Sequence, residues 1–127
     1  EYLDSGNYTH VGYFFGAPVY DGQSAYLPAG LKSVTVTQSE TIGANAFVGC
    51  SGLSEIVVAK AKIISDLAFG GCTGVSEFTV PSTVVSVGDS VFKNWTQAQT
   101  VRLSAGLDTS AWNKNWQAEC AAAVVTL

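Results

Sequence analysis

Residues 42–53 read IGANAFVGCSGL, and two later stretches follow the same pattern. Residues 64–75 read ISDLAFGGCTGV and residues 87–98 read VGDSVFKNWTQA. The three stretches start 22 and 23 residues apart, so their phenylalanines fall into one column, at Phe47, Phe69 and Phe92. Self-similarity at a fixed period of about 20 to 50 residues is the sequence signature of a repeat architecture. The sequence therefore predicts a solenoid.

Each repeat carries an alternating stretch before its aromatic part, as in residues 32–37, 55–58 and 77–80. Alternation with β-branched residues predicts a half-buried strand. A unit of this length cannot bury its own apolar face, so neighbouring units must stack and pair their strands in parallel, about 4.8 Å apart. The side chains expected to point inward are Val34, Val36, Ile56, Val58, Phe78, Val80, Val101 and Leu103.

The outward side chains of these strands form a regular exposed surface, which we call the strand face. We expect a partner to bind here, because a regular sheet offers a rigid platform that loses little entropy on binding. Its residues are Ser33, Thr35, Glu55, Val57, Glu77, Thr79, Thr100 and Arg102.

An inserted loop, roughly residues 17–26, is the competing binding surface. It carries Tyr20 and Tyr26, and tyrosine is a favoured anchor in binding loops. The same residues, with Ala17, Pro18 and Val19, could instead fold over the open first turn as a cap. We favour the cap, because the end of a solenoid must be covered.

The expected fold is an α/β solenoid, a right-handed coil of about five turns. Each turn of 22–23 residues would contribute one parallel strand and a short helical or 3₁₀ turn near the aromatic residue. Residues 1–127 are expected to form one domain, with regular repeats at 31–103. Residues 1–30 would be a degenerate first turn with the inserted loop, and residues 104–127 a last turn with a strand near Val124. Because position 1 is not Met, we expect the chain to be a fragment of a longer protein.

Residues 42–53 and 80–88 resemble the unit of the BspA-type leucine-rich repeat, which reads roughly I-P-x-x-V-x-x-I-G-x-x-A-F-x-x-C-x-x-L-x-x-I. The similarity extends over residues 31–103. The sequence departs from the pattern where Thr37 and Ala59 replace the proline and Trp95 replaces a cysteine. The resemblance implies a surface-exposed or secreted bacterial protein whose repeats bind proteins or other surfaces, and it implies no catalysis.

Few residues could support metal or nucleophilic chemistry. His10 is the only histidine and is expected to be a solvated loop residue. Cys50 and Cys72 share one inward column and are expected to be packed free thiols. A disulfide between them is the alternative, because stacked positions about 5 Å apart lie within the permitted Cα range. The three cysteines lack C-x₂-C spacing, so no zinc site is predicted.

Two pairs of residues have both a structural and a functional interpretation. Glu55 and Glu77 should lie side by side on the strand face. They could be an exposed pair whose repulsion is reduced by Arg102, placed diagonally, or they could be a calcium or acid–base site. Trp112 and Trp116 are four residues apart, which fits one helical turn covering the last coil. A carbohydrate-binding tryptophan pair is the alternative.

Composition excludes several functions. Six Lys and Arg against ten Asp and Glu give a net charge of −4, so no basic nucleic-acid surface is expected. No apolar run approaches the roughly 18 residues of a membrane span. We expect neither a cofactor nor catalysis, and we expect a monomeric chain with an extracellular location at the bacterial cell surface.

The leading hypothesis is a non-catalytic module of an exported protein that binds a protein or a glycan, as in adhesion or host interaction. The alternative is a structural spacer or an accessory repeat domain of a larger surface protein or enzyme. A parallel β-helix polysaccharide lyase is a remote third, because the outward columns hold only Glu55, Glu77 and Arg102 as charged residues.

Overall fold

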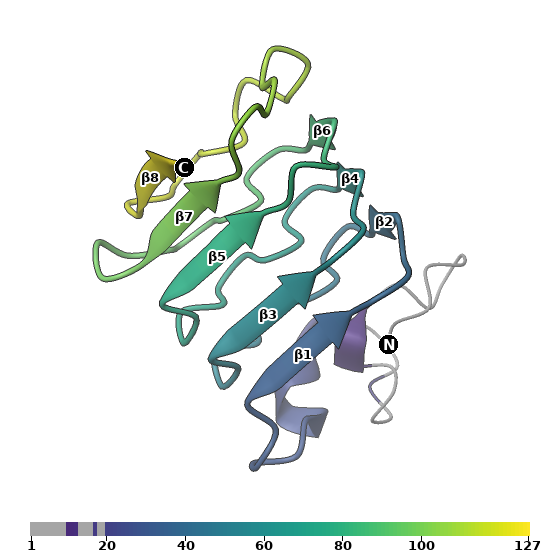
Figure 1. The fold of residues 1–127 in the computed structure, drawn as a ribbon. Coiled ribbons are helices and arrows are strands. Elements are labelled where there is room, and N and C mark those ends of the chain that lie inside the picture. Colours follow the sequence, from purple (N-terminus) through teal and green to yellow (C-terminus); the bar gives the residue numbers. More distant parts are fainter. Residues whose placement is uncertain (1–9, 13–16, 18–19) are drawn as a thin grey trace.

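The computed structural model describes residues 10–12, 17 and 20–127, and in it parallel strands follow one another at the repeat spacing. Five strands lie side by side in a row, with their ends aligned (Figure 1). Each hydrogen-bonded pair in the row is parallel and 22 or 23 residues apart, from Ser33↔Glu55 to Val101↔Val124. The strands are β1 (Ser33–Val36), β3 (Glu55–Val58), β5 (Glu77–Val80), β7 (Thr100–Leu103) and β8 (Ala123–Thr126).

A second row of short strands runs along one side of the coil (Figure 1). It consists of β2 (Thr41–Ile42), β4 (Ile63–Ile64) and β6 (Ser86–Val87), again paired in parallel. Together the two rows make a β-solenoid of about four turns. The predicted alternation is confirmed in β3 and β5, where outward residues are exposed and inward residues are buried.

The turn count is one lower than predicted. The segment before β1 contributes the 3₁₀ helix η2 (Gln23–Tyr26) and covers the end of the coil instead of adding a paired strand among the described residues. The repeat spacing also predicts an inward strand position at Leu3, which lies outside the described residues. At the other end the predicted strand is confirmed, because β8 pairs with β7 in the expected register. The right hand of the coil stays a prediction.

The predicted helical turns near the aromatic residues are wrong. Residues 44–49 and their counterparts form consecutive hydrogen-bonded turns, and η2 lies in the inserted loop. Asn45, Leu67 and Ser90 have φ of 62°, 59° and 54° at the equivalent position of three successive turns. A left-handed residue cannot continue a right-handed helix, so the backbone leaves the helical path there.

The segments around Phe47 and Phe69 lie on the side of the coil that we call the turn side. Their backbone N–H groups alternate between two kinds of acceptor. The N–H groups of Asn45, Phe47 and Gly49 donate to carbonyls of the next turn, at 3.0, 2.8 and 2.7 Å. The N–H groups of residues 46, 48 and 50 donate to carbonyls three residues back in their own turn. The next turn repeats this alternation from Leu67 to Cys72. The backbone donors of these two segments are thereby paired without a helix or a regular sheet.

The row of strands is not one continuous ladder. Hydrogen bonds join β1 to β3, β5 to β7, and β7 to β8. However, β3 and β5 belong to separate sheets although they are neighbours in the row. The expectation that the inward column lies in one sheet is therefore wrong between Ile56 and Phe78. Phe78 is the largest side chain of that column, and its ring centroid lies 4.5 Å from that of Phe69. The break therefore lies on the β3 side of Phe78, since on its other side Phe78 pairs with Val101 of β7.

The three column phenylalanines form the predicted interior stack. The ring centroids of Phe47 and Phe69 are 5.6 Å apart and nearly parallel, and those of Phe69 and Phe92 are 5.9 Å apart. All three side chains are fully buried. Trp116 extends the column, edge-on to Phe92 at 6.1 Å. The column thus runs through the core of successive repeats.

Trp95 replaces a cysteine without losing the cysteine's hydrogen bond. The Cys72 thiol donates to the carbonyl of Phe47 in the preceding turn, at 3.0 Å. One turn later the Trp95 indole N–H donates to the equivalent carbonyl, that of Phe69, at 2.8 Å. A buried indole N–H requires such a partner, and the repeat supplies it.

A buried glutamine corrects one predicted column. The repeat spacing placed Ala98 and Ala121 in register with the buried Leu53 and Val75, but both alanines are exposed. Gln99 and Ala122, one residue later, are buried instead. The Gln99 amide N–H₂ donates to the carbonyls of Cys72 and Val75, at 3.0 and 2.7 Å. Its oxygen accepts the N–H of Thr96, so the amide is fully paired although it is buried.

The inserted loop caps the coil through Gln23. Its side-chain N–H₂ donates to the carbonyls of Asn45 and Val48, at 3.2 and 3.1 Å, and its oxygen accepts the N–H of Gly12. The Val48 carbonyl corresponds to that of Gly70, which accepts the backbone N–H of Gly49 from the preceding turn. The Gln23 amide thus replaces the backbone donor of a missing turn.

Other cap residues depart from the predictions. Ala17 is buried, but Tyr20 and Tyr26 are about half exposed, and Pro18 and Val19 lie outside the described residues. His10 is buried rather than solvated, and its Nε2 lies 2.9 Å from the Ala17 carbonyl. A carbonyl only accepts, so Nε2 carries the proton in this contact. The repeat pattern also predicts that Val11 shares a column with Ile42, and this is wrong. The Val11 N–H donates to the Ala46 carbonyl as the Phe47 N–H donates to the Ala68 carbonyl, which places Val11 in the aromatic column.

Cys50 and Cys72 are buried free thiols, as predicted, and Cys120 is a partly buried one. Burial raises the pKa of Cys50 to about 12. Burial also raises the pKa of Cys72, and the neighbouring Cys50 raises it further. An unfolded thiol ionises near pH 9, so the preference for the neutral thiols stabilises the fold below pH 9 and is lost as the pH rises from 9 towards 12.

We expect Phe69→Ala to lower the free energy of unfolding by about 3–5 kcal/mol, because the truncation opens a cavity between two neighbouring phenylalanines. Urea denaturation followed by tryptophan fluorescence measures the change. Val57→Ala, at an exposed position, is the control and should change stability by less than about 0.5 kcal/mol. A loss for Phe69→Ala as small as that of the control would show that the column contributes nothing to the core.

Gln23→Ala should destabilise the fold by about 1–3 kcal/mol, because it removes the amide donor shared by the Asn45 and Val48 carbonyls and the acceptor of the buried Gly12 N–H. Gln38→Ala is the matched control, since the Gln38 amide oxygen accepts only an exposed bond from Lys60. Equal denaturation midpoints for the two variants would contradict the capping role.

At pH 8 iodoacetamide should modify Cys120 in the native chain and reach Cys50 and Cys72 only after denaturation without reductant, because the buried thiols stay protonated. Mass spectrometry counts the modified residues. Recovery of Cys50 and Cys72 joined to each other after denaturation would refute the free-thiol state.

Candidate functional site

The strand face is formed by outward side chains of four strands, in register within the pairs β1–β3 and β5–β7. Ser33 and Thr35 of β1 lie opposite Glu55 and Val57 of β3, and Glu77 and Thr79 of β5 lie opposite Thr100 and Arg102 of β7. The strand-face residues of β1, β3 and β5 are exposed, whereas those of β7, Thr100 and Arg102, are half-buried. β8 adds Ala123 and Val125 to the same columns, two residues that sequence reasoning left out of the site.

The charges of the strand face are few and partly paired. Both Nε and Nη2 of Arg102 donate to Oε1 of Glu77, at 2.9 and 2.7 Å. Arg102 lies opposite Thr79 in the register and therefore reaches Glu77 diagonally, while Glu55 makes no ion pair among the described residues. Val57 and Val125 keep 41% and 42% of their surface exposed and add apolar area to the face. The result is a mixed surface of hydroxyls, valines and three charged groups.

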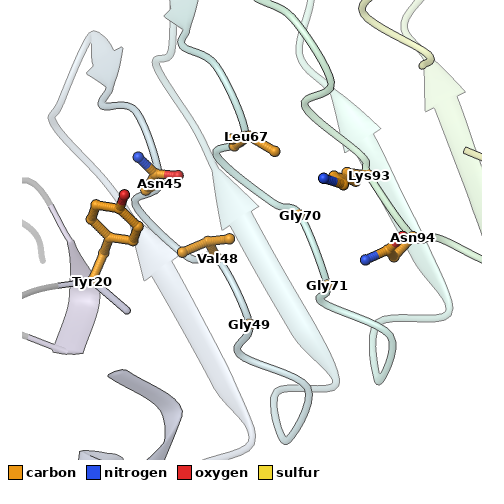
Figure 2. A pocket seen from close by; sticks show the side chains of 9 residues that line it. All are labelled: Tyr20, Asn45, Val48, Gly49, Leu67, Gly70, Gly71, Lys93 and Asn94. Atoms are coloured by element: carbon orange, nitrogen blue, oxygen red, sulfur yellow. The ribbon is translucent and has the colours of Figure 1, made fainter. Parts of the chain in front are cut away.

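A groove lies on the turn side of the coil, with the strands behind it (Figure 2). We call it the turn groove. It has a volume of about 320 Å³ and crosses three successive turns. Its lining residues are Tyr20, Asn45, Val48, Gly49, Leu67, Gly70, Gly71, Lys93 and Asn94.

The floor of the turn groove is open because the corners of successive turns lack side chains. Gly49 and Gly71 occupy equivalent corners with φ of 76° and 74°, and Asn94 follows them with φ of 67°. Such positive φ favours glycine and tolerates asparagine. A Cβ on Gly71 would lie 3.3 Å from the backbone of Gly49, so a side chain there would crowd the floor as well as strain the backbone.

Tyr20 and a polar pair stand at opposite ends of the turn groove. The Tyr20 ring lies beside Asn45 and Val48, and the side chains of Lys93 and Asn94 lie at the far end (Figure 2). Lys93 Nζ lies 3.6 Å from Glu119 Oε2. Sequence reasoning missed this groove, although the glycines at repeat corners were visible as a column. Its walls depend on how residues from three turns and the cap come together.

The described residues offer little for catalysis or metal binding. Within residues 10–12, 17 and 20–127, no three His, Cys, Asp or Glu residues come together as a metal site. His10 is buried in the cap, and the thiols of Cys50 and Cys72 are buried in the core. Among the helices that the structure describes, none has the length and apolarity needed to cross a bilayer.

The tryptophan pair is part of the core rather than a surface platform. Trp112 is only 6% exposed and meets Trp116 edge-on at 5.1 Å. The segment forms turns instead of the predicted helical turn. In the described part of the chain, the Trp112 Nε1 is a buried donor with no acceptor. A ligand could not stack on the Trp112 ring, so the carbohydrate interpretation of this pair loses its support.

Comparison with known proteins identifies the repeat. The family model described as BspA type leucine rich repeat region (6 copies) matches residues 22–115. A search of curated proteins and a search of solved structures each returned no match. The matched segment contains every strand from β1 to β7, and it covers most of the chain. The chain belongs to the BspA-type leucine-rich-repeat family.

Proposed function

We propose that the chain is a non-catalytic interaction module that binds a protein partner through its strand face. Repeats of this family are generally protein-interaction modules and are typically without catalytic activity. The observation that carries the proposal is the register of β1 with β3 and of β5 with β7, which aligns outward side chains within two paired blocks of one row of strands.

Rigidity supports this choice of surface. The backbone under the strand face is held by parallel ladders and by the turn-side hydrogen bonds, so little conformational entropy is lost when a partner docks. The exposed valines supply apolar contact, and Glu55 and Glu77 with Arg102 supply charged contacts that select the partner. The inserted loop is a weaker candidate, because the buried residues Gln23 and Ala17 pack it against the end of the coil.

The family is associated with bacterial surface proteins, and we infer an extracellular location at the bacterial cell surface for this chain. There the module would act as one monomeric repeat domain in adhesion or host interaction. A protein is the favoured partner class, because a long regular face suits an extended macromolecular surface.

Charge reversal of the strand face tests the proposal. The 127-residue chain is first assayed by surface plasmon resonance against a panel of purified extracellular matrix proteins, with an unrelated solenoid protein as the control for non-specific binding. Glu55→Lys combined with Glu77→Lys should reduce binding to the partner found by at least about tenfold, because charged contacts in the interface change sign. The melting temperature should shift by only a few degrees, since the broken Glu77–Arg102 pair is exposed and worth about 0–1 kcal/mol.

Glu40→Lys is the matched control, because Glu40 pairs with Lys62 in an equally exposed bridge away from the strand face. Full binding by the double variant, together with loss of binding in Tyr20→Ala plus Tyr26→Ala, would move the partner to the inserted loop and overturn the proposal. If no protein of the panel binds, the alternative of a structural spacer is favoured.

A further inference from the structure

The turn groove offers no backbone donors on its floor. Each N–H from Asn45 to Ser51, and each from Leu67 to Thr73, donates to a carbonyl of the coil. Recognition by addition of a β-strand needs unpaired backbone groups along an edge. An extended peptide therefore cannot add to this surface by main-chain pairing, and a ligand must be recognised by side chains and shape.

Three side chains in the turn groove have polar groups available for this purpose. The amides of Asn45 and Asn94 and the Tyr20 hydroxyl make no hydrogen bond among the described residues. Each amide combines two N–H donors with an acceptor oxygen, and a phenol both donates and accepts. Such groups suit a ligand that presents several hydroxyls, each of which is itself a donor and an acceptor.

The apolar parts of the groove suit the C–H faces of a sugar ring. Tyr20 is 46% exposed, and its ring stands at one end of the groove beside Val48 (Figure 2). An exposed aromatic ring provides a flat apolar surface with a polar tip. The glycine corners let a ring-shaped ligand approach the backbone closely, because no side chain covers them.

Charge favours a neutral ligand. The one cation of the lining, Lys93, lies 3.6 Å from the carboxylate of Glu119, which offsets its charge. A volume of about 320 Å³ lies at the lower end of the range for small-molecule sites, about 300–1,000 Å³. The site is thus sized for one or two sugar rings rather than for a long chain.

We propose that the turn groove is a binding site for a neutral mono- or disaccharide unit, stacked on Tyr20 and hydrogen-bonded by the side-chain amides of Asn45 and Asn94. This site lies on the turn side of the coil and is independent of the protein-binding strand face. The module would then have two surfaces that can bind different ligands independently.

Titration of the ¹⁵N-labelled chain followed by ¹H–¹⁵N correlation spectra tests the site. The probes are cellobiose, maltose, lactose and N,N′-diacetylchitobiose, with digalacturonic acid as a charged probe and a pool of unstructured decapeptides as the peptide probe. We expect at least one neutral disaccharide to shift the side-chain amides of Asn45 and Asn94 and the backbone amides of Gly49 and Gly71, with a dissociation constant of about 1–10 mM.

Tyr20→Ala should weaken this binding about fivefold to tenfold through loss of the stacking surface. Tyr26→Ala is the matched control, because Tyr26 is 48% exposed on η2 but does not line the groove. Asn94→Gly removes the amide while keeping the left-handed backbone, and it should also weaken binding. The Glu55→Lys plus Glu77→Lys variant should bind the sugar normally, which separates this test from that of the strand face.

The proposal is overturned if no neutral disaccharide shifts the groove amides at about 20 mM. It is also overturned if the decapeptides or the charged sugar alone shift them, or if Tyr20→Ala and Tyr26→Ala weaken binding equally. Folded spectra of each variant establish that a loss of binding is not a loss of structure.

Discussion

The alternating backbone hydrogen bonds on the turn side hold the repeats together. In residues 45–50 and 67–72, one N–H group closes a local turn and the next donates to the neighbouring repeat, as at Ala46 and Phe47. A helix would have used these donors internally and left the repeats without backbone hydrogen bonds between them on this side of the coil. The alternation requires a left-handed residue at Asn45, Leu67 and Ser90, and that requirement explains why the coil is almost free of helix.

This arrangement also explains how the ends and the irregular positions of the coil are accommodated. A ladder that stops leaves unpaired carbonyls, which are costly when they are removed from water. Gln23 supplies a side-chain amide to such carbonyls at the first turn, and Gln99 does so inside the coil. Trp95 occupies a cysteine position in the same way. Its indole N–H donates to the Phe69 carbonyl, which is equivalent to the Phe47 carbonyl that the Cys72 thiol bonds one turn earlier. Buried polar side chains in this chain complete the backbone network.

The two candidate surfaces arise from opposite sides of the same repeat. On the strand face, period-two alternation sends polar and charged side chains outward, and parallel pairing aligns them into columns. On the turn side, the glycine corners carry no side chains. This leaves a groove that is lined by Tyr20 and two asparagines. A long flat face suits a macromolecule, whereas a small groove suits a compact ligand. One fold can therefore carry two kinds of recognition without any catalytic group.

The repeat pattern alone determined the architecture and the strand face. The columns of Phe47, Phe69 and Phe92 and the alternation around Ile56 specify parallel stacking, because only stacking buries side chains that recur at this spacing. The sequence could not place Gln99 or His10, since a polar residue is buried only when the fold brings carbonyls to it. The opening of the ladder at Phe78 and the walls of the turn groove depend on side chains from different turns meeting in space. Periodicity reports which residues share a column, but only the tertiary structure decides which hydrogen bonds and which ring contacts those columns make.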